Sequence, residues 1–183
     1  MKSPLLAAIA VGWLAAAPMA AADFTERLPV GDSSLALQGA GTASYLLWDV
    51  YDAALYAPAG ASAEAISAAE VPMSLILEYH RDVRVDDIRK ATWKALDEQY
   101  TPAEREALRP GIDAIQDAMI DVSDGDRYRL DWVPGNGRLV LSLNGEIRFE
   151  SDDAELARSY FGIWLAEPPL SESLRAALLS RVE

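Results

Sequence analysis

The sequence contains few side chains from which a catalytic or metal-binding site can be built. It has no cysteine and one histidine, His80. Zinc and haem sites that use thiolate or imidazole ligands need several such residues, so the sequence excludes them. A serine nucleophile would need His80 as its base, but there is no Gly-x-Ser-x-Gly turn to present one, and His80 is out of phase with the apolar residues Leu77 and Tyr79 of its predicted strand. We therefore assign no catalytic residue, and we expect no metal and no other cofactor.

The acidic residues and the glycines also lack the spacing of a known kind of site. The acidic run at 121–126 has some features of a calcium loop, but its glycine falls one position early and no bidentate glutamate follows. Asp86 and Asp87 are adjacent on a predicted helix and point in different directions, which favours a helix-dipole role over acid and base catalysis. Gly39 and Gly41 lack the third glycine and the following helix of a dinucleotide site.

The first 22 residues have the pattern of a secretory signal peptide. Lys2 precedes an apolar stretch from Leu5 to Ala17, and a run of small residues ends at Ala22. The apolar stretch is shorter than the about 20 residues that span a bilayer, which favours a cleaved leader over a retained anchor. We expect residues 1–22 to be removed and residues 23–183 to form one domain that is exported, in the periplasm, without stable membrane insertion.

The composition excludes two classes of partner. The chain carries 29 acidic and 16 basic residues, for a formal net charge of −13. Nucleic acid and anionic membrane surfaces repel such a chain. The acidity is explained by solubility, although a contact with a partner protein through acidic residues stays open. Because there is no cysteine, the apolar core must stabilise the domain without disulfides.

Apolar residues that alternate with polar ones predict strands, and turn residues separate the strands. The predicted strands cover residues 35–38, 45–56, 75–79, 127–132, 138–143 and 146–150. Pro134–Gly137 and Asn144–Gly145 are turn sequences, so the last three strands should form an antiparallel meander. Gly39 and Gly41 should separate or bend the first two strands.

Helical patterns lie between the strands and after them. One helix is predicted from Val85 to about Tyr100, and Thr101-Pro102-Ala103-Glu104 opens a second, which Pro110-Gly111 should break. Asp152 with Glu155, and later Ser171, should cap two more helices. The order of strands, helices, strands and helices predicts an α+β fold, with an antiparallel sheet and its helices packed on one face.

Aromatic residues are the most distinctive side chains that remain. They are Tyr45, Trp48, Tyr51, Tyr56, Trp93, Tyr100, Trp132 and Trp164. Such residues at strand and helix periods are usually core residues. The alternative is that some of them line an apolar pocket between the sheet and the helices.

A series of short phrases also follows a set order along the chain. The phrases are Gly39-Ala-Gly41, Trp48-Asp-Val-Tyr51, Leu55-Tyr56-Ala-Pro58, Leu77-Glu-Tyr79-His-Arg81-Asp82-Val83, Val122-x-x-Gly125-Asp126, Asn144-Gly145, Phe161-Gly-Ile-Trp164-Leu165 and Ser171-x-x-Leu174-Arg175. Together they resemble the bacterial exported branch of the chalcone isomerase-like family, from about Leu35 to Leu179. The resemblance implies a sheet covered on one face by helices, with a ligand cleft between them. Plant members include isomerases that close chalcones to flavanones, and non-catalytic proteins that bind fatty acids.

One residue departs from the pattern of this family. The resemblance implies an arginine after the Gly-x-Gly phrase, which assists phenolate attack in the isomerases and holds the carboxylate in the fatty-acid binders. Here the corresponding residue is Ala43. Tyr51 matches a polar position that the family turns toward its ligand. Arg81 is retained, and it either clamps an anion or pairs with Asp82 or another carboxylate.

Three hypotheses of function follow. The first is a non-catalytic exported protein that binds a small apolar or amphipathic, fatty-acid-like ligand in the cleft, with Tyr51 and Arg81 as polar contacts and Trp48, Trp93 and Tyr100 as walls. The second is an intramolecular lyase or isomerase of the chalcone isomerase type. The third is an accessory protein that docks another exported protein.

Overall fold

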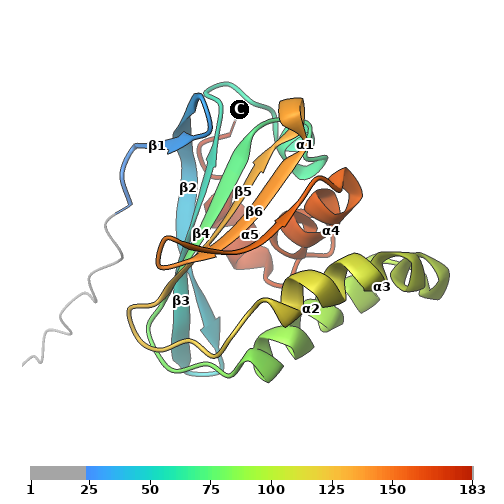
Figure 1. The fold of residues 1–183 in the computed structure, drawn as a ribbon. Helices are drawn as coiled ribbons and strands as arrows, with labels where there is room; N and C mark the ends of the chain where they lie inside the picture. The colour runs from blue at the N-terminus through green and yellow to red at the C-terminus, as the bar shows by residue number, and fades with distance from the viewer. Residues whose placement is uncertain (1–23, 183) are drawn as a thin grey trace, which may run out of the picture.

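The computed structural model describes residues 24–182, so the predicted signal peptide lies outside the described residues. Within them, seven strands form one antiparallel sheet in which each strand pairs with the next along the chain. The strands are β1 (Arg27–Val30), β2 (Ser33–Tyr45), β3 (Trp48–Ala57), β4 (Met73–Tyr79), β5 (Arg127–Val133), β6 (Arg138–Leu143) and β7 (Glu146–Ser151). Figure 1 shows the strands side by side, with helices on one side of the sheet.

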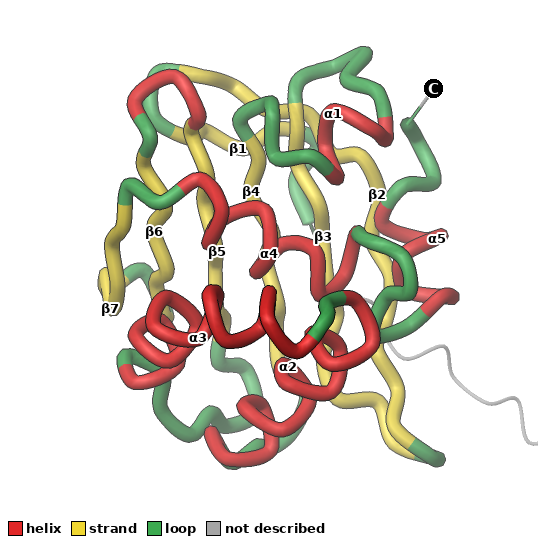
Figure 2. Tube along the Cα trace, turned by 90° about the vertical axis from the view of Figure 1, so that its right-hand side faces the viewer, coloured by secondary structure: helices red, strands yellow, loops and turns green. Residues whose placement is uncertain are grey.

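The helices all pack on the same face of the sheet (Figure 2). They are α1 (Ala63–Ser67), α2 (Val85–Gln99), α3 (Pro102–Asp117), α4 (Ala154–Leu165) and α5 (Glu172–Leu178). This arrangement confirms the predicted α+β fold and the predicted meander of the last three strands. No helix in the described part of the chain combines the length and the apolar character needed to cross a membrane.

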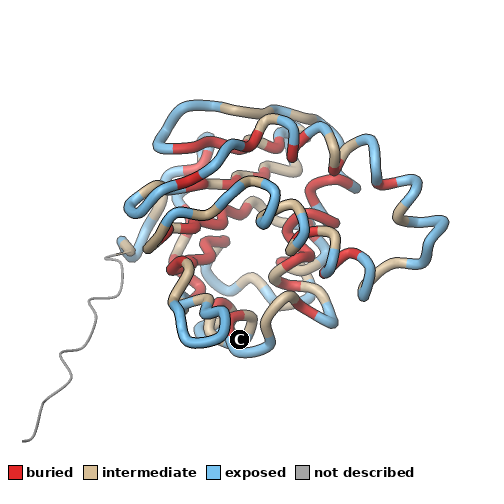
Figure 3. The backbone as a smooth tube through the Cα atoms, turned by 90° about the horizontal axis from the view of Figure 1, so that it is seen from below, coloured by how far each residue is buried: buried red, intermediate tan, exposed pale blue. Residues whose placement is uncertain are grey.

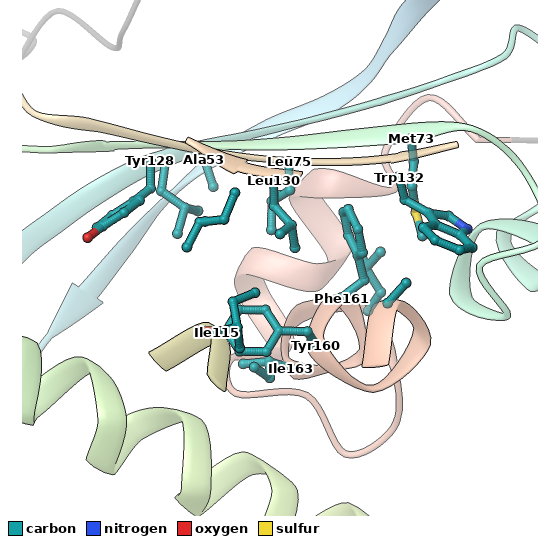
Figure 4. Packing of buried hydrophobic residues seen from close by; sticks show 14 of the residues in the cluster. Ala53, Met73, Leu75, Ile115, Tyr128, Leu130, Trp132, Tyr160, Phe161 and Ile163 are labelled. Carbon is teal, nitrogen blue, oxygen red and sulfur yellow. The ribbon is translucent and has the colours of Figure 1, made fainter. Parts of the chain in front are cut away.

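The main core lies between the sheet and the helices, because one face of every central strand carries apolar side chains (Figure 4). Leu75 and Leu130 project from neighbouring strands toward Phe161 of α4, and all three are buried. Trp132 is also buried, and its indole Nε1 donates a hydrogen bond to the Ala69 carbonyl at 2.8 Å. Figure 3 shows the buried residues gathered inside the molecule and the exposed ones on its outer turns.

The opposite face of the sheet has no helix layer among the described residues, but the sheet curls over it. Arg129 of β5 donates from Nη2 to the carbonyl of Pro29 in β1 at 2.8 Å, although β1 and β5 are not neighbours in the sheet. A second, smaller apolar cluster lies on this open face, and it includes Tyr56 and Ile76. The Tyr56 hydroxyl donates to the Thr25 carbonyl at 2.9 Å, which holds the segment before β1 against the sheet.

The boundary predicted between the first two strands was wrong. β2 runs through Gly39 and Gly41 to Tyr45, with a register shift between Leu37 and Gly39. The chain turns instead at Leu46-Leu47, where Leu46 has a φ of 56°. Leucine is not a typical turn residue, so the sequence did not indicate a turn at Leu46-Leu47. The two glycines suggested a turn, but their role is to make room for α5. The short elements β1 and α1 had not been predicted.

The predicted start of α3 is confirmed, and the predicted break inside it was wrong. Thr101 and Glu104 form a reciprocal capping box, as expected, but the helix continues past Pro110. Pro110 is exposed, so the carbonyl that loses its hydrogen-bond donor can be hydrated. The buried side chains of Leu108 and Ile112 keep the helix on the core on both sides of the proline.

Two more helix starts were predicted. Ser171 caps α5 by accepting from the Leu174 amide at 3.3 Å, as expected. The cap of α4 is Asp153 rather than Asp152, and it accepts from the amides of Glu155 and Leu156. Adjacent aspartates cannot be distinguished as caps by residue type alone.

The two glycines of β2 allow α5 to approach the backbone of the sheet. A Cβ atom added at Gly39 would lie 2.6 Å from the Leu178 carbonyl oxygen, and one added at Gly41 would lie 2.6 Å from the Ala177 Cβ. Real Cβ atoms essentially never come this close to another heavy atom. The Gly-x-Gly phrase therefore has a packing role, since α5 can cover β2 at this distance only where side chains are absent.

We expect Gly39→Ala to lower the free energy of unfolding by about 1 to 3 kcal/mol, because the new methyl group must displace the backbone of α5. Urea unfolding of both proteins measures the difference. Gly135→Ala is the matched control, since no heavy atom lies within 4 Å of a Cβ added there. Equal losses at Gly39 and Gly135 would contradict the packing role.

Pro110→Ala should raise the free energy of unfolding by about 1 to 2 kcal/mol, because the restored hydrogen bond inside α3 outweighs the greater freedom of the unfolded chain. Pro102 occupies the first turn of the same helix, where the amide is unpaired in any case. Pro102→Ala should therefore give no gain in the same urea titration. A stability gain at both prolines would show that the position inside the helix does not matter.

Candidate functional site

The candidate site lies on the helix-facing side of β3, where Tyr51 meets α4. The Tyr51 side chain is buried, and its hydroxyl oxygen accepts a hydrogen bond from Nε1 of Trp164 at 3.0 Å. Ala43 of β2 stands directly opposite Tyr51 in the sheet and is half-buried. The bond between the phenol and the indole thus joins the sheet to the helix layer inside apolar surroundings.

Aromatic rings surround this polar pair. The ring centroid of Tyr79 lies 5.5 Å from that of Tyr51 and 6.3 Å from that of Tyr128, and the Tyr160 and Trp164 rings are 6.3 Å apart. Tyr51, Tyr79, Tyr128 and Tyr160 are all buried. The environment is therefore mostly apolar, with phenol hydroxyls as its polar groups.

Burial keeps these phenols protonated. Loss of hydration raises the pKa of Tyr51 to about 12, against a smaller opposite effect of the hydrogen bond from Trp164. Burial likewise raises the pKa of Tyr79 well above its usual value, and that of Tyr160 is raised by the same cause. Near neutral pH the three side chains are hydrogen-bond donors, and none of them is a general base.

The position at which the family resemblance implies an arginine carries no charge in this chain. Ala43 follows Gly39 and Gly41 on the side of β2 that pairs in register with Leu55, Ala53 and Tyr51. This strip of the strand faces the helix layer and is made of small residues, of which the glycines are covered by α5. A ligand at Tyr51 would therefore meet a methyl group where a guanidinium was implied.

Arg81 and Trp48 come together near the end of the β2–β3 hairpin. The guanidinium carbon of Arg81 lies 5.0 Å from the centroid of the Trp48 ring, within the range of a cation–π interaction. The Trp48 side chain is exposed. No ion pair among residues 24–182 includes Arg81, so the tryptophan ring, and not the carboxylate of Asp82, is its neighbour here.

The other two predicted wall residues lie on and after α2. Trp93 is half-buried, and the guanidinium carbon of Arg109 in α3 lies 4.6 Å from its ring centroid. Tyr100 follows the last residue of α2 and is half-buried, which raises its pKa. Both pack against the main core. Trp93 therefore contacts Arg109, and Trp48 contacts Arg81. Tyr100 packs against the core beneath the helices.

Trp164 was not selected as a site residue from the sequence, although its helix was predicted. An indole N–H that is removed from water needs a hydrogen-bond acceptor. This general rule is the one argument from the sequence that could have identified Trp164 as a residue with a polar partner. Its acceptor, Tyr51, lies 113 positions away along the chain, so the pairing depends on the tertiary fold.

His80 and its partner lie on the open face of the sheet. Nε2 of His80 is 3.2 Å from Oδ2 of Asp52, and Oδ1 of Asp52 accepts from the Thr42 hydroxyl at 2.6 Å. Asp52 is buried and adjacent to Tyr51 on β3, so the two side chains point to opposite faces. The imidazole is therefore separated from Tyr51 by the sheet itself.

A hollow of about 570 Å³ lies on the same open face. Its apolar lining includes Val30, Ile76 and Val140, and its polar lining includes Arg129 and Arg138. Each of these two arginines is paired with a carboxylate: Nε of Arg129 lies 2.8 Å from Asp131, and Nη2 of Arg138 lies 2.6 Å from Glu150. The volume suits a small ligand. The curl of the sheet forms this hollow, and the sequence analysis did not predict it.

Comparisons with known proteins agree with this architecture. A crystal structure of a fatty-acid binding protein from Arabidopsis thaliana superposes on the chain with a TM-score of 0.65 and 17% sequence identity, covering 85% of this chain and 90% of that one. At this identity the likeness concerns the fold. A search of curated protein sequences finds no match. The family model described as chalcone isomerase-like matches residues 16–180, and this chain therefore belongs to the chalcone isomerase-like family.

Proposed function

We propose that this protein binds a small amphipathic molecule of the fatty-acid kind next to Tyr51, between the sheet and the helices, and does not transform it. The observation that carries the proposal is the hydrogen bond from the Trp164 indole to the Tyr51 hydroxyl oxygen. This bond holds the phenol in place and uses its oxygen as an acceptor. Its own proton can then be donated to a ligand carboxylate.

The surroundings make this donor effective. Tyr51 is 9% exposed, and a hydrogen bond to an ionised carboxylate is stronger where water is largely excluded. The raised pKa of Tyr51 keeps its proton in place near neutral pH. The nearby rings of Tyr79 and Trp164 make the surroundings of this phenol apolar, as an alkyl chain requires.

The same groups argue against an isomerase or lyase. General acid–base catalysis of ring opening or closing is most effective with a group whose pKa lies near the operating pH. The tyrosines around Tyr51 are neutral donors, and Ala43 supplies no positive charge to assist a phenolate. The pair formed by His80 and Asp52 lies across the sheet. Binding without reaction is the function that these residues support.

The structural relative adds support of a general kind. It is described as a fatty-acid binding protein, and it shares the fold of this chain over most of both lengths. In our proposal, Arg81 and Trp48 form the polar end of the site, and Trp93 and Tyr100 are walls of its apolar part. These roles remain predictions that depend on the position of the ligand.

We expect Tyr51→Phe to weaken the binding of oleate to the delipidated protein by about tenfold to a hundredfold, because the variant loses a hydrogen bond to a charged group worth about 1.5 to 3 kcal/mol. Isothermal titration calorimetry measures the affinity. Tyr56→Phe is the matched control, since it removes a buried hydroxyl from the open face of the sheet.

Val140→Lys separates the two places where a ligand could lie. Val140 lines the hollow on the open face, and a lysine there should leave oleate affinity unchanged if the ligand lies at Tyr51. Loss of binding in Val140→Lys with full binding in Tyr51→Phe would move the site to the hollow. Delipidated wild-type protein that binds no fatty acid would contradict the proposed function itself.

We also propose that the chain belongs to the bacterial exported branch of its family and acts in the periplasm after removal of residues 1–22. The pattern of Lys2, the apolar stretch and the small residues before Asp23 supports this proposal. Intact-mass measurement of the protein from a periplasmic fraction should give a chain that starts near Asp23. A full-length chain found only in the cytoplasmic fraction would refute export.

A further inference from the structure

The tip of the β2–β3 hairpin exposes four consecutive large apolar side chains. Tyr45 is 71% exposed, Leu46 81%, Leu47 94% and Trp48 63%. We refer to these four residues as the hairpin tip. The other exposed large apolar residues of the described chain, Ile120 at 43% and Ile147 at 53%, are less accessible and are isolated in the sequence. A contiguous exposed apolar group of this kind marks a contact surface more often than a chance exposure.

The hairpin tip projects beyond the rest of the sheet. β4 pairs with β3 only as far as Tyr51, and the His80 amide donates to the Val50 carbonyl at 2.9 Å, so the chain from Ser44 to Asp49 forms a two-stranded ribbon without a third strand. Figures 1 and 2 show the joined ends of β2 and β3 running past the neighbouring strands. The tip therefore stands clear of the other strands of the sheet.

The turn carries apolar side chains at a cost in backbone energy. Leu46 has a φ of 56°, a conformation that costs an L-residue with a side chain about 1 kcal/mol or more, and that asparagine or glycine adopts more easily. The leucine at position 46 therefore opposes the local preference of the backbone. Its presence is explained if the side chain itself makes a contact outside the domain.

We propose that the hairpin tip inserts into the interface of a lipid bilayer with zwitterionic headgroups. Tyrosine and tryptophan on either side of two leucines match the chemistry of this interface, where amphipathic rings lie at headgroup level and aliphatic side chains reach the hydrocarbon. Tyr45 and Trp48 pair directly across the hairpin, so the two rings flank the leucines at the same level.

Charge complementarity supports this partner. Arg81 lies over the Trp48 ring, which places a guanidinium, the group that pairs best with phosphate, beside the tip. Asp49, the carboxylate nearest to the tip in the sequence, accepts from the Ser44 hydroxyl at 2.6 Å. The net charge of −13 disfavours a strongly anionic surface, so the proposal concerns zwitterionic lipid.

The size of the hairpin tip disfavours a protein partner. A stable protein interface takes roughly 20 to 30 residues from each side. The tip offers four exposed apolar residues on a narrow ribbon. A bilayer adapts to a small insertion and requires no matching shape. This inference does not need a ligand at Tyr51, but it gives Trp48 and Arg81 a role in addition to the one proposed for them in ligand binding.

Flotation with phosphatidylcholine vesicles tests the proposal on the protein as it is isolated from its own compartment. We expect wild-type protein to partition to the vesicles at least tenfold more strongly than the double variant Leu46→Asp/Leu47→Asp. The double variant Ile120→Asp/Ile147→Asp adds the same two charges at exposed apolar residues outside the tip and should partition as wild type does. Urea midpoints of all three proteins verify that they are folded.

Two outcomes would overturn the inference. One is that wild-type protein stays with the soluble fraction, or that the double variant floats as well as wild type does. The other is that the same double substitution leaves vesicle binding unchanged and abolishes the capture of a defined protein partner, which would assign the tip to protein docking. Arg81→Gln should weaken vesicle binding severalfold, and no effect of this substitution would remove the phosphate contact from the proposal.

Discussion

The separation of the sheet into two unlike faces is the constraint on which the rest of the structure depends. Side chains alternate between the two faces along each strand, and the register shifts in β2 and between β6 and β7 interrupt this alternation only locally. The helices cover one face with a continuous apolar core, and the other face carries ion pairs and a smaller apolar cluster. Tyr51 and Asp52 are neighbours in the sequence and yet belong to different chemical environments for this reason.

Local patterns were sufficient to predict much of this architecture. The alternation in 127–132, the turn at Asn144-Gly145 and the capping box at Thr101 each depend on a few adjacent residues, and each is present in the structure. The errors arose where distant contacts decide local structure. Pro110 stays inside α3 because buried side chains hold this helix on the core before and after the proline. The glycines of β2 make room for α5, which lies far away along the chain.

The candidate site was predictable only in part for the same reason. Tyr51 and Arg81 were selected through the family resemblance, which is a property of short phrases. The contacts of these residues depend on the tertiary fold. The partner of Tyr51 is Trp164, which is 113 positions away along the chain. Trp48 contacts Arg81 because the hairpin turns at Leu46, where no turn was predicted. The hollow on the open face depends on the curl of the whole sheet, which no local pattern encodes.

The close fit of α5 on β2 also bears on the order in which the molecule can assemble. The hairpin of β2 and β3 is local and can form early, but the bare backbone strip at Gly39 and Gly41 stays in contact with water until the last helix arrives. The Arg181 amide then donates to the Gln38 carbonyl at 2.8 Å, which ties the segment after α5 to β2. A chain synthesised from its N-terminus therefore completes these contacts only after residue 181 is available, so a product that stops before α5 would remain a recognisable target for quality-control proteases.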